Sequence, residues 1–396
     1  MLFFNKSHYP IGLDISDLSI KLVQLNNIRD KIKIQAIGRI NLPKGIIESG
    51  EIKRQDELIK AIKKLIANPG YGKVSSEEAI VCLPESKTFI KLIEVAKSPN
   101  PIPEIIGSEI EKHFPLLINE IYYDWQLIKN LPEKYIILIG AASKNIINQY
   151  SEMLDMAKLS PIALEIESIS ICRSLLKEES PRFSITSSLL TRKKLSDEKK
   201  NINYAIIDIG ANHTSMIFYS TNTVLFTVSM PISGEQINNE IAETLKINLE
   251  QAEKAKIICG FDDDKAQGIV KNILNNMIEG LIKKINEAIE FFNSHFSELG
   301  PLDHILICGG GSNIKNIDKI ISQAISIGVS QADALINLHE TREKFSKILN
   351  EKHNFDLNLI KKGGGNNKVL SIQQDTSLTF ATAIGLALRG IFIDEL

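Results

Sequence analysis

The sequence contains few cysteines, and no two of them are close together. Four of its 396 residues are cysteines, at Cys82, Cys172, Cys259 and Cys308. A structural zinc site or a redox dithiol needs cysteines a few residues apart, so neither kind of site is indicated. We expect four reduced and buried thiols, as is usual in a cytosolic protein.

A charge excess of one sign and long apolar runs are also lacking. Lys and Arg total 46 and Asp and Glu total 48, which gives a formal net charge of −2. Nucleic-acid-binding proteins usually carry a strongly basic face, so no nucleic-acid partner is expected. No apolar run approaches the roughly 20 residues of a membrane-spanning helix, so no transmembrane segment is predicted. The length favours a globular protein of two or more domains.

What the sequence does contain is one pattern that occurs twice, in residues 11–25 and 204–218. Each stretch has an apolar strand, an acid (Asp14 or Asp208), a small polar turn and a second apolar strand. Turn amides of this kind can bind phosphate oxygens, and the carboxylate can hold a hydrated Mg²⁺. An ordinary solvent-facing hairpin is the alternative for the first stretch alone. The repetition favours two related lobes that face one cleft.

A third candidate segment is glycine-rich. Residues 304–308 read as a buried strand that runs directly into Gly309, Gly310 and Gly311, and a helix follows. Glycines between a strand and a helix let the backbone approach a ligand closely. The segment lacks the Gly-Lys-Ser/Thr of a P-loop, and a tight turn without a ligand is the alternative interpretation.

The remaining pattern predicts an inserted module and a helical part. Residues 88–95, 122–128 and 135–141 read as strands, and 102–113 and 145–158 as helices. This module contains the only Trp, which indicates either a binding surface or a buried aromatic cluster. A long helix is expected over 265–296, where apolar residues recur every three or four positions.

These elements predict the following division of the chain. The first lobe comprises 1–84 and 160–200, and a small strand-helix-strand-strand insert in that lobe comprises 85–159. The second lobe has its core in 202–235 and 299–336 and a helical subdomain in 236–298. A helix in 377–396 connects back and packs on the first lobe. Residues 178–201 have the composition of a mobile loop, and 337–376 that of a charged, partly disordered insertion.

The order of two hairpins, a glycine-rich strand end and a final helix of small residues resembles the actin, sugar kinase and heat-shock chaperone ATPase superfamily. The resemblance implies an α/β fold of two lobes, duplicated ribonuclease-H-like domains, with ATP and Mg²⁺ bound between them. Residues 113–121 and 123–128 of the insert are similar to the insert of the PilM family of type IV pilus proteins. FtsA, the cell-division relative, shares the fold but matches these motifs less well.

The resemblance also implies roles for individual residues. Asp14 and Asp208 would hold Mg²⁺, and Asp208 with Glu167 would be the catalytic residues, Glu167 positioning water. Glu253 and Lys256 would approach the ribose and base. The remaining nucleotide-binding positions would be Gly12, Ser16, Ser19 and Lys21 in the first hairpin, Gly210, Ala211, Asn212 and Thr214 in the second, and Gly309, Gly310, Gly311 and Ser312 in the third segment.

The first turn departs from the family pattern. Ser16 stands where the family usually has glycine, and Asp17 adds a negative charge beside the expected phosphates. An exposed Asp17 would be screened by salt and have little effect. A carboxylate that faced the cleft would repel a nucleotide.

The resemblance implies a cytoplasmic scaffold of the type IV pilus machine, or of the related competence or secretion systems. It would bind the cytoplasmic tail of a PilN-like inner-membrane protein, contact other pilus components and lie peripherally at the membrane through that partner. Self-association is possible, and ATPase activity is expected to be weak or absent. The alternatives are an FtsA-like cell-division filament protein and, less favoured, a small-molecule kinase of the same fold.

Overall fold

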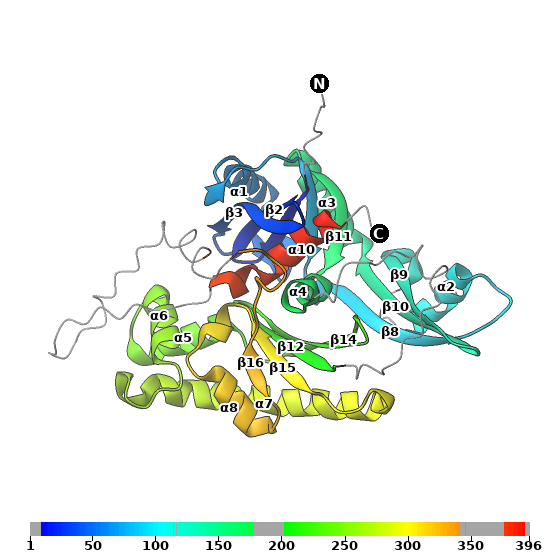
Figure 1. Cartoon of the computed structure of the whole chain (residues 1–396). Helices are drawn as coiled ribbons and strands as arrows, with labels where there is room; N and C mark the ends of the chain where they lie inside the picture. Colours follow the sequence, from blue (N-terminus) through cyan, green and yellow to red (C-terminus); the bar gives the residue numbers. More distant parts are fainter. Residues whose placement is uncertain are drawn as a thin grey trace.

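The computed structural model describes residues 9–113, 115, 117–177, 202–340, 345 and 376–392 (Figure 1). Its strands form two large sheets and one small β-ribbon. The first sheet has the order β11-β7-β1-β2-β3-β6 and the second β16-β15-β12-β13-β14-β8-β10-β9. The strands of the first sheet are β1 (Ile11–Ser16), β2 (Ser19–Ile28), β3 (Lys31–Asn41), β6 (Tyr71–Gly72), β7 (Glu78–Leu83) and β11 (Ser160–Ile166). Those of the second are β8 (Thr88–Ala96), β9 (Ile121–Asn130), β10 (Lys134–Ser143), β12 (Tyr204–Ile209), β13 (Thr214–Ser220), β14 (Thr223–Met230), β15 (His304–Cys308) and β16 (Val329–Gln331).

Five strands in each sheet repeat one topology. In the first sheet β1, β2 and β3 are antiparallel neighbours, and β7 and β11 follow in parallel on the other side of β1. In the second sheet β12, β13 and β14 are antiparallel neighbours, and β15 and β16 follow in parallel beside β12. The two hairpins that the sequence singles out therefore occupy the same position in two copies of one unit.

Two helices cross between the sheets, α4 (Glu167–Leu175) and α10 (Ala381–Ile391) (Figure 1). A Cβ atom on Gly385 of α10 would lie 1.8 Å from the carbonyl oxygen of Ser170 in α4. A Cβ atom on Gly12 of β1 would lie 2.3 Å from the Ala383 carbonyl oxygen of α10. The small residues of α10 thus let its backbone contact both α4 and the first sheet.

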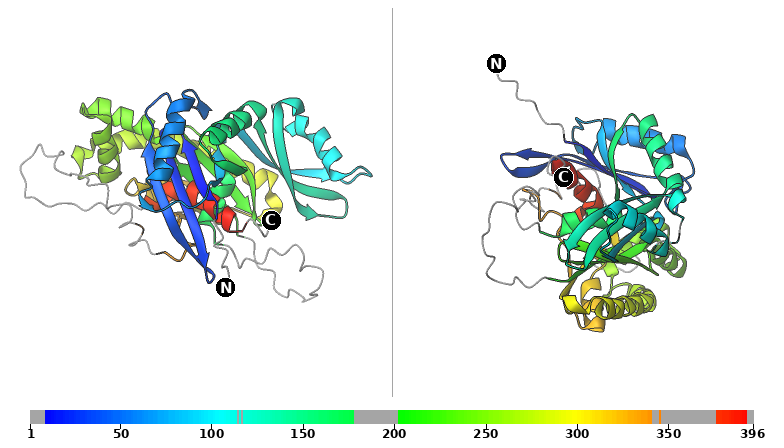
Figure 2. Two further views of the ribbon diagram at one scale, coloured as in Figure 1. Left: turned by 90° about the horizontal axis from the view of Figure 1, so that it is seen from above. Right: turned by 90° about the vertical axis from the view of Figure 1, so that its right-hand side faces the viewer.

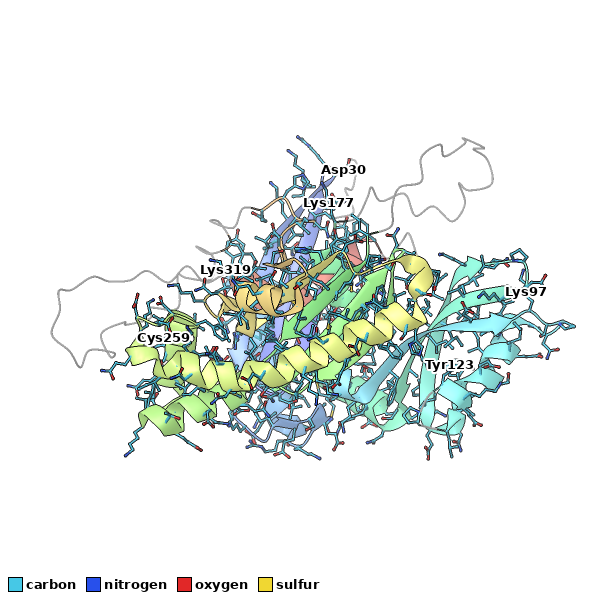
Figure 3. All side chains as sticks on the ribbon, turned by 90° about the horizontal axis from the view of Figure 1, so that it is seen from below. Asp30, Lys97, Tyr123, Lys177, Cys259 and Lys319 are labelled. Atoms are coloured by element: carbon cyan, nitrogen blue, oxygen red, sulfur yellow. The ribbon has the colours of Figure 1, made fainter. Side chains whose placement is uncertain are left out.

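Helices also cover the outer faces of the sheets. The first lobe is covered by α1 (Gln55–Ala67) and α3 (Lys144–Met156), whose buried residues include Leu58, Ile62 and Tyr150. The second lobe packs on α7 (Ile269–His295) and α8 (Ile317–Ile325), with α5 (Gly234–Leu245) and α6 (Leu249–Cys259) at one end. Figure 3 shows α7 running under the sheet from the side of Cys259 to the insert that carries Tyr123.

The long helix begins later than its apolar pattern predicts. We expected it from residue 265, but α7 begins at Ile269 after a 3-10 turn, Ala266–Gly268. Gln267 and Gly268 have φ values of 54° and 73°, which are incompatible with a continuous right-handed helix. Along α7 the buried residues recur every three or four positions, apart from the adjacent pair Ile273 and Leu274, and they include Leu281, Ile285 and Phe292.

The insert differs from our expectation in two ways. Its strands β8, β10 and β9, covered by α2 (Ile102–His113), extend the sheet of the second lobe, because Lys91 of β8 pairs with Phe226 of β14. In addition, α3 was expected in the insert, but its apolar face packs into the core of the first lobe. From above, the insert and the α5–α6 end lie at opposite ends of the molecule (Figure 2).

Two of our predictions concern segments that the structure covers little or not at all. Residues 178–201 and nearly all of 337–376 lie outside the described residues. Among the helices that the structure describes, none combines the length and the apolar character that crossing a membrane requires.

Candidate functional site

The first hairpin places a buried ion pair at the expected phosphate turn. Asp14 of β1 lies opposite Lys21 of β2, and its Oδ2 atom is 2.6 Å from the lysine Nζ. Burial raises the pKa of Asp14, and the charge of Lys21 opposes that shift. Arg39 of β3 lies opposite Lys21, so the three side chains form a row across three strands. The row places one carboxylate and two positively charged side chains at the expected position of the phosphates.

The second hairpin presents Asp208, near the end of β12. The Sγ atom of Cys308, in the neighbouring β15, donates a hydrogen bond of 3.6 Å to Asp208 Oδ1. Burial, and then the negative charge of Glu167, raises the pKa of Asp208 to about 6. The charge of Glu167 also contributes to the raised pKa of Asp14, so one carboxylate acts on both hairpin acids.

Glu167 is the first residue of α4 and connects three elements. Its Oε2 atom lies 3.6 Å from Nε2 of His213 in the second hairpin, and Thr382 of α10 donates a 3.4 Å hydrogen bond to Oε1. Burial alone would raise the pKa of Glu167, but the close contact with His213 and the charges of His213 and Lys21, with the Thr382 hydrogen bond, oppose it and the pKa is lowered. The close contact with the Glu167 carboxylate in turn raises the pKa of His213 to about 9. Glu167 is therefore ionised and His213 protonated at neutral pH.

A further acid, Glu85, completes a cluster of buried carboxylates. It lies just after β7 in a 3-10 turn, Glu85–Lys87. Burial and the charge of Glu167 raise its pKa to about 7. Its Oε2 atom is buried and has no hydrogen-bond partner among the described residues. Burial therefore disfavours the ionised form of Asp14, Glu85 and Asp208, and a nearby divalent cation would favour it.

The acidic side chains suit a magnesium ion that keeps most of its water better than a metal ion enclosed by protein ligands. Among residues that the structure describes, no group of three or more His, Cys, Asp or Glu side chains is arranged to hold a metal. Mg²⁺ is usually bound through one or two carboxylates, water and substrate phosphates. Asp14 and Asp208 match that requirement. In the second hairpin, the buried hydroxyl of Thr214 has no described hydrogen-bond partner and could contact a bound group.

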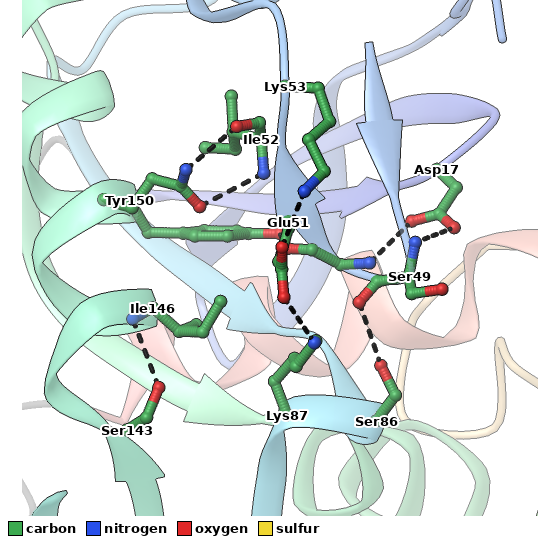
Figure 4. A network of polar contacts seen from close by, with 12 residues as sticks. Asp17, Ser49, Glu51, Ile52, Lys53, Ser86, Lys87, Ser143, Ile146 and Tyr150 are labelled. Carbon is green, nitrogen blue, oxygen red and sulfur yellow. Dashed lines mark hydrogen bonds and ion pairs between the residues drawn. The ribbon is translucent and has the colours of Figure 1, made fainter. Parts of the chain in front are cut away.

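The turn of the first hairpin is held by its own side chains. Ser16 Oγ donates to the Ser19 carbonyl oxygen at 2.9 Å and lies 3.3 Å from Ser19 Oγ. Asp17 accepts hydrogen bonds from the backbone amides of Ser49 at 2.9 Å and Gly50 at 3.0 Å (Figure 4). It also accepts one of 2.9 Å from Asn212 Nδ2, in the second lobe. Asp17 is thus half-buried and hydrogen-bonded by both lobes. The two situations that we had considered were a freely exposed carboxylate and one that faces the cleft.

The glycines of the predicted motifs serve mostly in packing. Gly309 has a φ of 76°, and a Cβ atom there would lie 2.2 Å from Asp208 Oδ1. A Cβ atom on Gly311 would lie 2.1 Å from the Ile209 side chain, whereas a Cβ atom on Gly310 would have no neighbour within 4 Å. Ser312 is fully buried and donates to the Gly309 carbonyl oxygen at 2.7 Å. Gly310 therefore leaves the open space beside this strand end, while Gly12 and Gly210 contact neighbouring backbone.

The predicted ribose-side residues reach the second hairpin through α5. Lys256 is 2 % exposed, and its Nζ lies 2.6 Å from Glu253 Oε2 and donates a 3.3 Å hydrogen bond to the Gly234 carbonyl oxygen. Gly234 in turn donates to the Gly210 carbonyl oxygen at 3.0 Å. Glu235 donates its amide to the Ala211 carbonyl oxygen at 2.8 Å. These two backbone hydrogen bonds attach the start of α5 to the turn of the second hairpin.

The structure adds residues that our sequence reasoning missed. Arg39, Glu85 and His213 surround the two hairpin acids, and Lys44 forms an ion pair with Glu235 across the lobes. His213 lies in the turn that we had identified, so its place in the motif was a usable signal. Glu85 and Lys44 lie in loops, where residue type alone indicates no site.

Comparisons with known proteins show to which family the chain is similar. A family model described as type IV pilus assembly protein PilM matches residues 12–391. The cell division protein FtsA of Buchnera aphidicola is 24% identical over 82% of this chain and 83% of its own length. FtsA of Bacillus subtilis is 23% identical over 83% of this chain and 79% of its own.

Solved structures show the same fold. A PilM–PilN type IV pilus biogenesis complex matches with a TM-score of 0.73 and 19% identity, over 97% of this chain and 98% of that one. The ethanolamine utilization protein EutJ of Carboxydothermus hydrogenoformans matches with a TM-score of 0.51 and 13% identity, over 96% of this chain and 89% of that one. The predicted two-lobed, actin-like α/β fold is therefore confirmed.

Proposed function

This chain belongs to the PilM family of type IV pilus assembly proteins, and from that premise we propose that it is a nucleotide-binding scaffold that docks a PilN-like membrane protein. The observation that carries the nucleotide part is that the turns of the two equivalent hairpins meet, since Asp17 in one accepts a hydrogen bond from Asn212 in the other. The charge of Glu167 also contributes to the raised pKa of both hairpin acids. Two lobes that each supply one carboxylate to one buried cluster are suited to holding a metal–phosphate group between them.

The residues have separate roles in this proposal. Asp14 and Asp208 hold Mg²⁺, which neutralises their charge and that of the nucleotide phosphates. Lys21 and Arg39 bind phosphate oxygens, as do the exposed amides of Ala211 and Asn212. Glu253 and Lys256 approach the sugar side, and Gly310 leaves space for the base.

We propose that nucleotide turnover is slow or absent. Glu167 is the residue expected to position water, but one of its oxygens lies 3.6 Å from His213 Nε2 and the other accepts a 3.4 Å hydrogen bond from Thr382. An ionised carboxylate in an ion pair is a weak base towards water. The site is therefore suited to a conformational switch that responds to nucleotide binding.

The partner in this proposal is the cytoplasmic tail of an inner-membrane protein. One solved structure that shares this fold is a complex of PilM with PilN. In this chain the insert offers an edge strand, β9, with Tyr122, Tyr123 and Leu127 exposed. An extended peptide can bind beside such a strand through main-chain hydrogen bonds and side-chain pockets. The protein would thereby lie at the inner face of the membrane without crossing it.

A membrane pull-down tests this proposal. The purified protein is incubated with detergent-solubilised membranes, with and without ATP and Mg²⁺, and captured proteins are identified. We expect recovery of a small bitopic protein with a short cytoplasmic tail, in amounts that change with nucleotide. The Asp208→Asn variant is the control, because it should capture the same protein without responding to nucleotide.

The FtsA matches favour a second candidate, a cell-division filament protein. Recovery of a tubulin-like partner, without the bitopic protein, would favour that candidate and contradict ours. Phosphorylation of a small metabolite by the purified protein would instead indicate a kinase.

A further inference from the structure

Asp17 connects the two lobes through one carboxylate. It accepts hydrogen bonds from Ser49 N and Gly50 N in the first lobe and from Asn212 Nδ2 in the second. We propose that Asp17 is a built-in anion that latches the lobes together and competes with a nucleotide phosphate for Asn212. This inference rests on the proposed nucleotide site and concerns its regulation.

The first-lobe side of the latch is a rigid anchor. Ser49 and Gly50 have φ values of 50° and 80°, so their consecutive amides turn towards the same carboxylate, as in anion-binding backbone nests. Tyr150 donates a 3.2 Å hydrogen bond to the Gly50 carbonyl oxygen, and Glu51 forms ion pairs with Lys53 and Lys87 (Figure 4). Asp17 thus occupies a site of the kind that binds a phosphate oxygen.

The second-lobe side is the turn expected to bind phosphate. Gly210 donates its amide to the His213 carbonyl oxygen at 3.0 Å, which closes the turn around Asn212. The ion pair between Lys44 and Glu235 joins the same two regions beside the Asp17–Asn212 hydrogen bond. The two contacts form one latch, which we define by Asp17, Asn212, Lys44 and Glu235.

Competition follows from the chemistry of the shared donor. The Asn212 amide gives one of its two N–H groups to Asp17, which orients its side chain towards that carboxylate and leaves only the second N–H for a phosphate oxygen. A phosphate that approaches Asn212 also brings negative charge towards the carboxylate, which is unfavourable at short range. Nucleotide binding should therefore release Asp17, and removal of Asp17 should favour nucleotide binding.

The test compares Asp17→Ser with the wild type and with Asp56→Ser. The control removes one carboxylate from an exposed position of the same lobe, in the first turn of α1. Without added nucleotide, Asp17→Ser should increase hydrogen–deuterium exchange in residues 210–214 and at the Ser49 and Gly50 amides. With ATP and Mg²⁺, calorimetry should give an affinity about threefold to tenfold tighter, as expected for one charge-assisted hydrogen bond at an exposed site.

Two further variants separate the latch from local unfolding. Asn212→Ala should increase exchange in 210–214 but leave Ser49 and Gly50 protected, because Asp17 keeps both backbone hydrogen bonds. Lys44→Gln should increase exchange in 210–214 by a smaller factor than Asp17→Ser. These results would support the latch even if Asp17→Ser folded poorly.

The outcomes distinguish the latch from the nucleotide site. Unchanged exchange in 210–214 for both Asp17→Ser and Asn212→Ala would overturn the latch. Faster exchange with weaker ATP binding by Asp17→Ser would overturn the competition. Faster exchange with no ATP binding by any variant or the wild type would support a lobe-to-lobe latch and contradict the proposed nucleotide function.

Discussion

Replacement of Gly385 by alanine should separate the two helices that join the lobes. A Cβ atom at this position would lie 1.8 Å from the Ser170 carbonyl oxygen and 2.5 Å from the Ser170 carbonyl carbon. Neither neighbour is the end of a flexible side chain, so α4 and α10 would have to move apart. Gly280, in the interior of α7, has no atom within 4 Å of the corresponding position and provides a matched control.

The two substitutions should change the free energy of unfolding in opposite directions. Alanine is favoured over glycine in a helix interior by roughly 1 kcal/mol, and Gly280→Ala should gain most of that. Gly385→Ala gains the same term but adds overpacking, which typically costs about 1–3 kcal/mol and should be larger against backbone. We expect Gly385→Ala to be destabilised by about 1–3 kcal/mol and Gly280→Ala to be stabilised by about 0.5–1 kcal/mol.

Urea unfolding of the two variants and the wild type measures these differences. Hydrogen–deuterium exchange of α4 and α10 then locates the effect, which should be confined to the crossing in Gly385→Ala. The close packing of these helices would be refuted if Gly385→Ala and Gly280→Ala were equally stable.

The remaining predictions concern the charged groups of the site. His213 has its pKa raised to about 9, so its stabilising ion pair should be complete below about pH 6.5 and lost as the pH rises through 9. Because 43% of its side chain is exposed, the change should not exceed about 1 kcal/mol, and urea unfolding of His213→Gln should lack it. Asp208, with a pKa near 6, should lose Mg²⁺–ATP affinity as the pH falls through 6, so calorimetry should find wild type and Asp208→Asn alike at pH 5. Arg39→Ala should weaken ATP binding about threefold to tenfold in the same assay, whereas Arg29→Ala, at the far end of β2–β3, should not change it.

The hairpins and the duplicated sheet could be predicted from the sequence because local pattern determines them. The apolar runs that end at Asp14 and Asp208 each form a buried strand followed by a short turn, and alternation sets the face on which each acid lies. The glycines at 309–311 marked a real strand end, although Gly310 alone leaves open space.

Other features depend on contacts between distant parts of the chain. The pairing of Lys91 with Phe226, which extends the second sheet into the insert, leaves no pattern in either strand. The same holds for Asp17, whose partners Ser49 and Asn212 are 32 and 195 residues away. Residue type showed a charge in the turn, but only the fold shows that backbone amides and the other lobe bind it.

Calorimetric titration with ATP, in the presence and absence of Mg²⁺, tests most directly whether the two lobes form one nucleotide clamp. The account predicts saturable binding that requires Mg²⁺ and is weakened at least about tenfold by Asp14→Asn, because one of two metal-binding carboxylates is lost. The same affinity with and without Mg²⁺, or in wild type and Asp14→Asn, would contradict the assignment of the metal ligands. An absence of binding at millimolar ATP would contradict the clamp itself.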